Sequence, residues 1–166
     1  WDPRTGKYER VRSQYDGATP PDIPPELKDL CQRGLLAAST AAEAAGYAHG
    51  LPTMRPDICL ANFYPPGGKL GMHQDKSESR NSLNRGAPVV SLSIGDAADF
   101  YYSKSSREDM GTKVLLESGD LLVFGGAARL VYHGVTNIHS STAPQQLVKR
   151  SNLRPGRLNL TFRESE

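Results

Sequence analysis

The sequence predicts a mainly β protein with one flanking helix, folded as a double-stranded β-helix, also called a jelly roll. Three observations lead to this fold class. The chain has 166 residues, the usual size of a single domain with its own hydrophobic core. From residue 57 onward it reads almost entirely as short strands, eight in number. The turns between them are rich in Gly, Asp and Ser, and such a series is typical of a jelly roll.

The N-terminal part is expected to contain one helix. Residues 1–23 are polar, charged and proline-bearing, with little periodicity. Pro24 and Pro25 then introduce a helix over 26–45, because proline is favoured in a first turn and Gly46 can end the helix. Its expected buried stripe consists of Leu27, Leu30, Cys31, Leu35 and Ala38. We therefore expect a separate segment over 1–23 and a single domain over 24–166 that includes this helix.

The strands follow in close succession. We expect them near 57–64, 69–73, 88–95, 98–103, 112–117, 120–125, 129–135 and 157–163. Residues 136–156 form the longest stretch without a predicted strand, and a long loop in a compact domain is often functional. A jelly roll gathers side chains from opposing strands around one opening, which suits a site whose residues are far apart in the sequence.

One histidine pair with an aspartate has the composition of a metal site. His73 and Asp75 are two residues apart, so an extended backbone projects both to the same side. With His133 from another strand they form the two-histidine, one-carboxylate set that holds non-haem Fe(II) and leaves coordination positions open. The H-x-D pair alone is frequent by chance, and a single histidine is more often a surface or hydrogen-bonded core residue.

The segment 157–163 alternates in polarity like a half-buried strand. Arg157, Asn159, Thr161 and Arg163 share one side, and Leu158, Leu160 and Phe162 share the other. Arginines on an interior face are costly to bury without anionic partners, and a dicarboxylic acid would supply them. The alternative is a solvated outer face.

Four blocks together resemble the AlkB family of Fe(II)/2-oxoglutarate-dependent dioxygenases, in the family's order and at compatible separations. They are N-F-Y-P-P-G-G-K-L-G-M-H-Q-D-K (62–76), A-P-V-V-S-L-S-I-G (87–95), S-G-D-L-L-V-F-G-G-A-A-R-L-V-Y-H-G-V (118–135) and R-L-N-L-T-F-R (157–163). The resemblance covers most of the chain from about residue 57 onward. It implies an enzyme that uses Fe(II), 2-oxoglutarate and dioxygen to remove N-methyl groups from bases in DNA or RNA, releasing formaldehyde, succinate and CO2.

The resemblance also implies roles for individual residues. His73, Asp75 and His133 would hold the iron. Arg157 would pair with the distal carboxylate of 2-oxoglutarate, assisted by Asn62 and Tyr64, while Asn159 and Arg163 would serve the end nearer the metal.

The same resemblance identifies residues 1–23 as part of a nucleotide-recognition lid. Trp1 and Tyr8 have the separation of the aromatic residues in that lid, and a flipped base would lie between Trp1 and His73. The alternative is that Trp1 packs on the core. Ser77 stands where the bacterial repair enzymes carry an acidic residue beside the base, and Glu78 would start from the opposite face. A neutral base such as 6-methyladenine therefore stays open beside 1-methyladenine and 3-methylcytosine, and methylated RNA stays open as well.

Composition favours an intracellular protein. Two cysteines are too few for a disulfide framework, and no apolar run is long enough to cross a bilayer. The chain begins at Trp1 without a methionine, so we expect it to be part of a longer protein, in which any targeting peptide would not be visible here. The expected location is the nucleus or cytoplasm, with an organelle as the alternative, and the expected state is a monomer without a membrane partner. The net charge of +2 does not argue for or against nucleic acid. The basic residues after Asp120 predict a basic loop beside the presumed site that would suit a phosphate backbone, and the alternative is an ordinary solvated loop.

Two other function classes remain open. The chain could be a 2-oxoglutarate oxygenase that acts on a protein or a small molecule. It could also be a jelly roll without catalytic activity that serves as an interaction module.

Overall fold

The computed structural model describes residues 2, 4, 6, 9, 11, 12, 14–47 and 50–166. Its elements in chain order are α1 (Pro25–Ala44), β1 (Ile58–Tyr64), β2 (Leu70–His73), α2 (Arg80–Asn84), β3 (Val89–Gly95), β4 (Ala97–Ser103), β5 (Thr112–Leu116), β6 (Leu121–Phe124), the 3-10 turn η1 (Gly126–Ala128), β7 (Tyr132–His139), α3 (Gln145–Ser151) and β8 (Arg157–Arg163).

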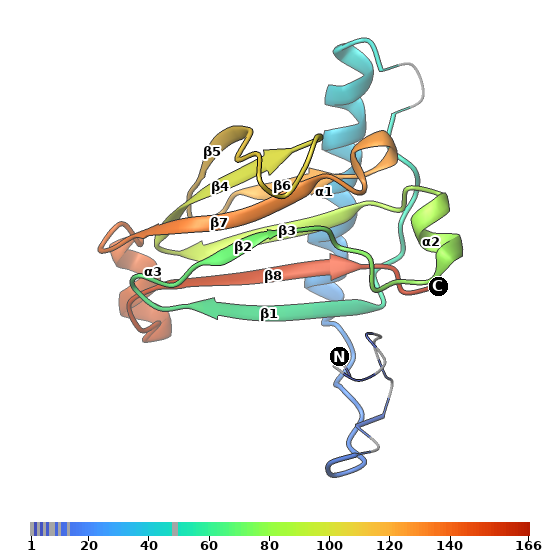
Figure 1. The fold of residues 1–166 in the computed structure, drawn as a ribbon. Coiled ribbons are helices and arrows are strands. Elements are labelled where there is room, and N and C mark those ends of the chain that lie inside the picture. Colours follow the sequence, from blue (N-terminus) through green and yellow to red (C-terminus); the bar gives the residue numbers. More distant parts are fainter. Residues whose placement is uncertain are drawn as a thin grey trace.

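The strands form two four-stranded antiparallel sheets that face each other (Figure 1). One sheet has the order β1-β8-β3-β6, and the other has the order β2-β7-β4-β5. Strands that are consecutive in the sequence therefore often lie in different sheets, as in a jelly roll. The predicted fold class is confirmed.

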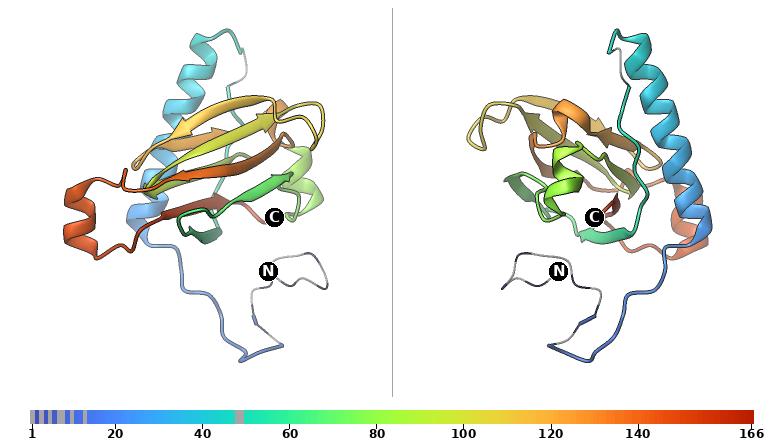
Figure 2. Two further views of the ribbon diagram at one scale, coloured as in Figure 1. Left: turned by 60° about the vertical axis from the view of Figure 1, so that its left-hand side comes forward. Right: turned by 90° about the vertical axis from the view of Figure 1, so that its right-hand side faces the viewer.

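Helix α1 covers the outer face of the first sheet, as the side views show (Figure 2). Cys31 and Leu35 are its buried residues, and Leu27 and Leu30 are partly buried against the same cluster. They pack on Val90, Leu92 and Phe162 of the sheet. The helix begins and ends within one residue of the prediction. None of the described helices combines the length and the hydrophobicity that crossing a bilayer requires.

A second hydrophobic cluster lies between the two sheets. It consists of Ala98, Phe100, Leu116, Val135 and Ile138, with partly buried side chains such as Leu122 around it. This cluster fills one part of the space between the sheets. The remaining part is polar and contains the candidate site.

Strand β8 separates these two environments. Phe162 and Leu160 lie in the cluster under α1. On the opposite face, Arg157, Asn159, Thr161 and Arg163 are all buried, between 2% and 8% exposed. They line a cavity between the sheets, so the expected polar face is the interior one and not a solvated outer face.

The prediction of a strand over 129–135 was wrong at its start, because β7 begins only at Tyr132. The chain first makes the turn η1, and Arg129 is buried there with its guanidinium bonded to main-chain oxygens. A strand through this position would point that side chain elsewhere.

The prediction that 136–156 is a long loop without a strand was also wrong. Strand β7 continues to His139, which pairs with Ala97 of β4. Helix α3 then begins after Pro144 and ends at Ser151, and the next residue, Asn152, adopts a left-handed conformation. Sequence analysis likewise missed the short helix α2, which Ser79 caps by accepting a hydrogen bond from the main-chain N–H of Ser82.

Candidate metal centre

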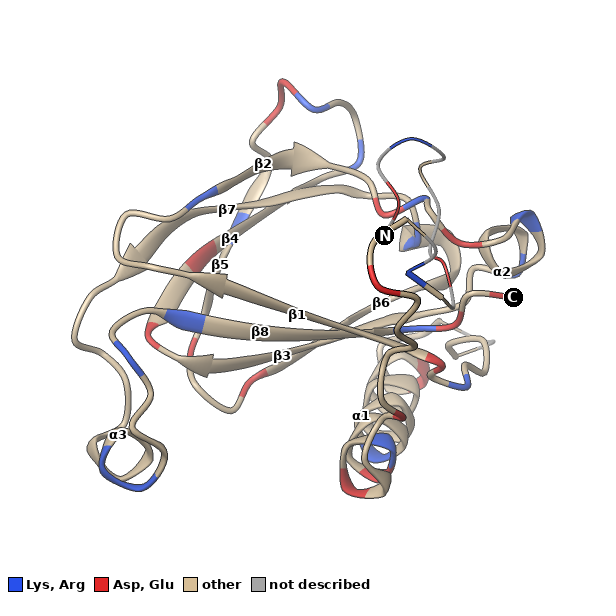
Figure 3. Ribbon diagram, turned by 90° about the horizontal axis from the view of Figure 1, so that it is seen from below, with Lys and Arg blue, Asp and Glu red and all other residues tan. Residues whose placement is uncertain are grey.

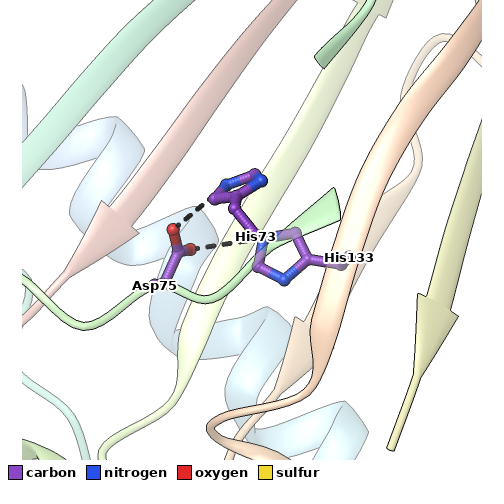
Figure 4. Close-up of side chains that lie close together, drawn as sticks. All are labelled: His73, Asp75 and His133. Atoms are coloured by element: carbon purple, nitrogen blue, oxygen red, sulfur yellow. Dashed lines mark ion pairs between the residues drawn. The ribbon is translucent and has the colours of Figure 1, made fainter. Parts of the chain in front are cut away.

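Two strands and the loop after one of them bring His73, Asp75 and His133 together. His73 is the last residue of β2 and lies directly opposite His133 of β7. Asp75 follows in the loop after β2. Figure 4 shows the carboxylate facing both imidazoles. Asp75 Oδ1 is 3.6 Å from His73 Nε2, and its Oδ2 is 3.6 Å from His133 Nε2. One ligand atom from each residue lies within 4.8 Å of the others, which allows all three to bind one ion.

The hydrogen bonds of the two imidazoles engage Nδ1 and leave Nε2 available to a metal. His73 Nδ1 lies 2.9 Å from the carbonyl oxygen of Gly71, and His133 Nδ1 lies 3.1 Å from that of Val131. A carbonyl oxygen can only accept, so Nδ1 carries the proton in each ring. Nε2 is then the unprotonated nitrogen that faces Asp75, and the ring orientation is fixed by its other nitrogen.

The charge states also suit a cation. Burial acts to raise the pKa of Asp75, but the hydrogen bond from His73 and the charge of Arg163 outweigh it and lower that pKa to about 2. When His73 is protonated, its Nε2 can donate to Asp75, which raises the pKa of His73, whereas burial lowers the pKa of His133. Asp75 is therefore anionic, and His133 favours the neutral form that a metal needs.

The three side chains open into a cavity of about 70 Å³ between the sheets. Its walls are partly polar, from β1, β3 and β8, and partly aromatic. The rings of Phe100 and Phe124 lie 5.7 Å and 5.0 Å from the His133 ring, measured between centroids. They separate the metal centre from a larger apolar cavity of about 840 Å³ that they also line. Phe100 also belongs to the hydrophobic cluster between the sheets.

Arg157 lies in this cavity as a buried cation. Its side chain is 2% exposed, and Nη2 donates to Ser93 Oγ at 2.9 Å. Its Nε has no hydrogen-bond partner, and among the described residues no carboxylate lies within ion-pair distance of the guanidinium. Burial lowers the pKa of Arg157. An acidic group of a bound molecule would supply the missing partner, which is the fit expected for a dicarboxylate such as 2-oxoglutarate.

Asn62 and Tyr64 line the cavity near Arg157, and the Tyr64 ring lies 5.6 Å below its guanidinium carbon. Asn159 lines it too, but its amide is already bonded within the protein. Asn159 Nδ2 donates to Ser91 Oγ at 2.7 Å and to the main-chain oxygen of Leu92 at 3.1 Å, and its Oδ1 accepts from Thr161 at 2.8 Å. This residue therefore braces the strands beside the cavity.

Arg163 contacts the metal carboxylate itself. Its Nη2 lies 2.7 Å from Asp75 Oδ2, and its Nη1 donates to Glu78 Oε1 at 3.0 Å. Sequence analysis assigned it to the bound cosubstrate. The structure places it against Asp75 and Glu78, where it also lines the cavity, and its role toward the cosubstrate stays a prediction.

The predicted substrate residues have different outcomes. Trp1 and Tyr8 lie outside the described residues. Ser77 is half-buried but does not line the cavity, so its role stays a prediction. The Glu78 side chain is fully buried and paired with two arginines. It therefore cannot present its carboxylate to a base in place of the missing acidic residue.

The basic residues after Asp120 do not form one surface. Arg129, Arg157 and Arg163 are buried. Lys149 and Arg150 are exposed on α3, which lies at the opposite end of the sheets from α2 and the C-terminus (Figure 3). The expected basic loop beside the metal centre was therefore wrong, because half of these side chains serve the interior.

Sequence analysis missed the ion pair between Glu78 and Arg129, whose Oε2 and Nη2 lie 2.9 Å apart. Arg129 belongs to the block 118–135, whereas Glu78 lies two residues after the block 62–76. Their pairing could not be predicted, because 51 positions separate them and neither belongs to a regular element.

The two-sheet fold with this triad and a buried arginine defines the class of the protein. The chain belongs to the 2OG-Fe(II) oxygenase superfamily, which it matches over residues 1–163. The expected Fe(II) and 2-oxoglutarate are thereby confirmed at the level of the family.

Individual relatives place the chain within the AlkB family. The solved structure of OsALKBH1 superposes with a TM-score of 0.87 at 46% identity, covering 95% of this chain and 72% of that one. The Arabidopsis thaliana DNA N(6)-methyladenine demethylase ALKBH1C is 48% identical over 99% of this chain. The Escherichia coli dioxygenase AlkB is 40% identical over 87% of it. This chain spans 37% of the length of ALKBH1C and 57% of the length of the Escherichia coli protein.

Proposed function

We propose that the protein is a dioxygenase that oxidatively removes N-methyl groups from nucleic-acid bases. The observation that carries the proposal is the His73, Asp75 and His133 triad beside the buried Arg157, which has no carboxylate partner among the described residues. Fe(II) and 2-oxoglutarate would together supply the oxidation by dioxygen that hydroxylates the methyl carbon, after which the nitrogen loses formaldehyde.

The residues of the chain would hold and orient these groups. His73 and His133 would bind the metal through Nε2, with Nδ1 of each ring fixed by a main-chain oxygen. Asp75 would be the anionic ligand, and because Arg163 engages its Oδ2, Oδ1 is the oxygen left for the ion. Arg157 would bind the distal carboxylate of 2-oxoglutarate at the other end of the cavity, beside Asn62 and Tyr64. The aromatic wall would limit the access of water to His133.

For the substrate we propose a neutral base, 6-methyladenine in DNA. Two observations support this choice. Ser77 carries no charge, and the nearby Glu78 forms ion pairs with Arg129 and Arg163, so neither offers a free carboxylate to a cationic base. The relatives ALKBH1C and ALKBH1D from Arabidopsis thaliana are named as DNA N(6)-methyladenine demethylases. A yeast relative is named as a tRNA demethylase, so methylated RNA belongs in the test.

The proposal is tested by mass spectrometry of methylated oligonucleotides. DNA and RNA strands that carry 6-methyladenine, 1-methyladenine or 3-methylcytosine are incubated with the protein, Fe(II), ascorbate and 2-oxoglutarate. We expect loss of the methyl group from 6-methyladenine with equal amounts of formaldehyde and succinate, and none with Asp75→Ala. Succinate without demethylation of any strand would refute the nucleic-acid substrate and favour a protein or small-molecule substrate. No succinate at all would favour an interaction module.

The charge argument has its own test. Ser77→Asp introduces a carboxylate at the position where the bacterial repair enzymes carry an acidic residue. We expect it to raise activity on 1-methyladenine relative to 6-methyladenine by roughly tenfold or more, the value of one charge-assisted hydrogen bond. Ser77→Asn, of similar size and without charge, is the matched control. Equal ratios in both variants would contradict the argument.

We also propose an intracellular location, which the two free thiols of Cys31 and Cys59 support. The monomeric state, the absence of a membrane partner and the division of the chain at residue 23 stay predictions.

A further inference from the structure

The metal carboxylate lies on a part of the chain without regular structure. Asp75 follows β2, and residues 75–78 belong to no helix or strand. Among the described residues, no hydrogen bond between main-chain groups fixes 75–78. The two histidines, in contrast, lie on paired strands. Something other than the sheet must therefore hold Asp75 in place.

Side chains hold it at both ends. Arg129 Nη1 donates to the main-chain oxygen of Asp75 at 2.6 Å, and Arg163 Nη2 lies 2.7 Å from Asp75 Oδ2. Arg129 is itself fixed, because its Nε donates to the main-chain oxygen of Ala87 at 2.8 Å. The orientation of the carboxylate thus depends on where two guanidinium groups lie.

Glu78 connects these two groups. Its Oε1 is 3.0 Å from Arg163 Nη1, and its Oε2 is 2.9 Å from Arg129 Nη2. The contacts Asp75–Arg163–Glu78–Arg129–Asp75 therefore close a ring. The Glu78 side chain has no exposed surface, and those of Arg129, Asp75 and Arg163 are between 3% and 9% exposed. Two carboxylates and two guanidinium groups balance in charge within this ring.

We propose that Glu78 is a positioning residue that holds Arg129 and Arg163 so that Asp75 is oriented for the metal. The inference rests on the proposed metal site. It assigns a task to a carboxylate that touches neither metal nor cosubstrate. Without Glu78, two buried guanidinium groups would share the single charge of Asp75 and would repel each other, and the carboxylate would lose its fixed orientation. Partners of metal ligands that lie one contact away are typically worth 10–100-fold in metal affinity.

The test is the affinity for Co(II), followed by its visible absorption without 2-oxoglutarate or substrate. Glu78→Gln preserves the shape and removes the charge, and we expect its dissociation constant to rise roughly 10–100-fold. Glu78→Asp keeps the charge but is too short to reach both arginines, so we expect a smaller rise. A constant for Glu78→Gln within twofold of the unmodified protein would overturn the proposal.

A matched control is Asp96→Asn. Asp96 is another buried carboxylate, 2% exposed, that accepts main-chain hydrogen bonds from Thr142, Ala143 and Gly156. We expect a lower melting temperature and an unchanged Co(II) affinity for this variant. An equal loss of affinity in Asp96→Asn would show that Glu78 acts only through general stability, and would overturn the proposal.

Two further outcomes are distinguishable. If Glu78→Gln does not fold, Glu78→Asp decides, and unchanged Co(II) affinity in that variant would also overturn the proposal. If the unmodified protein does not bind Co(II), the metal site itself is refuted. Binding by the unmodified protein with equal binding by Glu78→Gln refutes the positioning role alone.

Discussion

Replacing Arg157 with methionine is expected to change two measurable quantities in opposite directions. The guanidinium is 2% exposed, and the structure shows one hydrogen bond from it, to Ser93. Its removal loses about 1 kcal/mol for that bond. It also removes the desolvation of a buried charge, and apolar replacement of buried ionic groups is neutral or stabilising by about 1–4 kcal/mol. The protein without ligand should therefore be as stable as before, or up to about 3 kcal/mol more stable.

The affinity for 2-oxoglutarate should fall in the same variant. Truncating one partner of a buried charge pair costs about 2–5 kcal/mol, and 3 kcal/mol corresponds to roughly a 150-fold weaker binding. Urea unfolding measures the first quantity. Calorimetric titration of 2-oxoglutarate, with Mn(II) in place of Fe(II) and without oxygen, measures the second.

Arg154→Met is the control. Arg154 lies three positions before Arg157 in the sequence, but its side chain is exposed and stacks on the ring of Phe63. Neither quantity should change by more than about 0.5 kcal/mol. An unchanged 2-oxoglutarate affinity in Arg157→Met would refute the assigned role. Destabilisation by more than about 2 kcal/mol would show that the buried charge is already compensated within the protein.

Three other predictions concern the core, the thiols and the metal ligands. Phe162→Ala should lower the free energy of unfolding by about 3–5 kcal/mol in urea, because Phe162 is 1% exposed beneath α1; a loss below 1 kcal/mol would contradict this packing. Cys31 should resist iodoacetamide at pH 8 until the protein is unfolded, because burial raises the pKa of its thiol to about 11, and mass spectrometry of the native protein would reveal any early labelling. Co(II) affinity should fall as pH is lowered from 8 to 6, because the His73 ring must lose a proton to bind the metal. The pKa of His73 is raised by the hydrogen bond that its protonated form makes to Asp75. A Co(II) affinity that does not depend on pH in this range would argue against His73 as a ligand.

The sequence predicted the strands best where polarity alternates. Strand β8 was predicted at its observed bounds, because Arg157, Asn159 and Thr161 alternate with leucines and both faces are buried for different reasons. Helix α1 was predicted within one residue at each end, since prolines precede it and an apolar stripe runs along it. Helix α2 has only five residues, too few for a periodic pattern to appear.

The residues of the site could be predicted from the sequence, but most of the contacts between them could not. His73 and His133 lie opposite each other because β2 pairs with β7, and the spacing of the motifs is enough to suggest this pairing. The placement of Arg163 against Asp75, and of Glu78 between two arginines, depends on how a loop folds back on β8. No periodicity in the sequence reports such contacts, because each joins segments that are separated by dozens of residues.

Strand β8 carries the buried arginines Arg157 and Arg163 on one face and core side chains such as Phe162 on the other. Adjacent residues of a strand point to opposite faces, so deleting or inserting one residue within β8 would turn the arginines toward α1 and the leucines into the cavity. Loss of folding and loss of ligand binding would then be inseparable. Variants of this chain that alter its chemistry while keeping its architecture must therefore arise by substitution in this segment, and changes of length are tolerable only in its flanking loops.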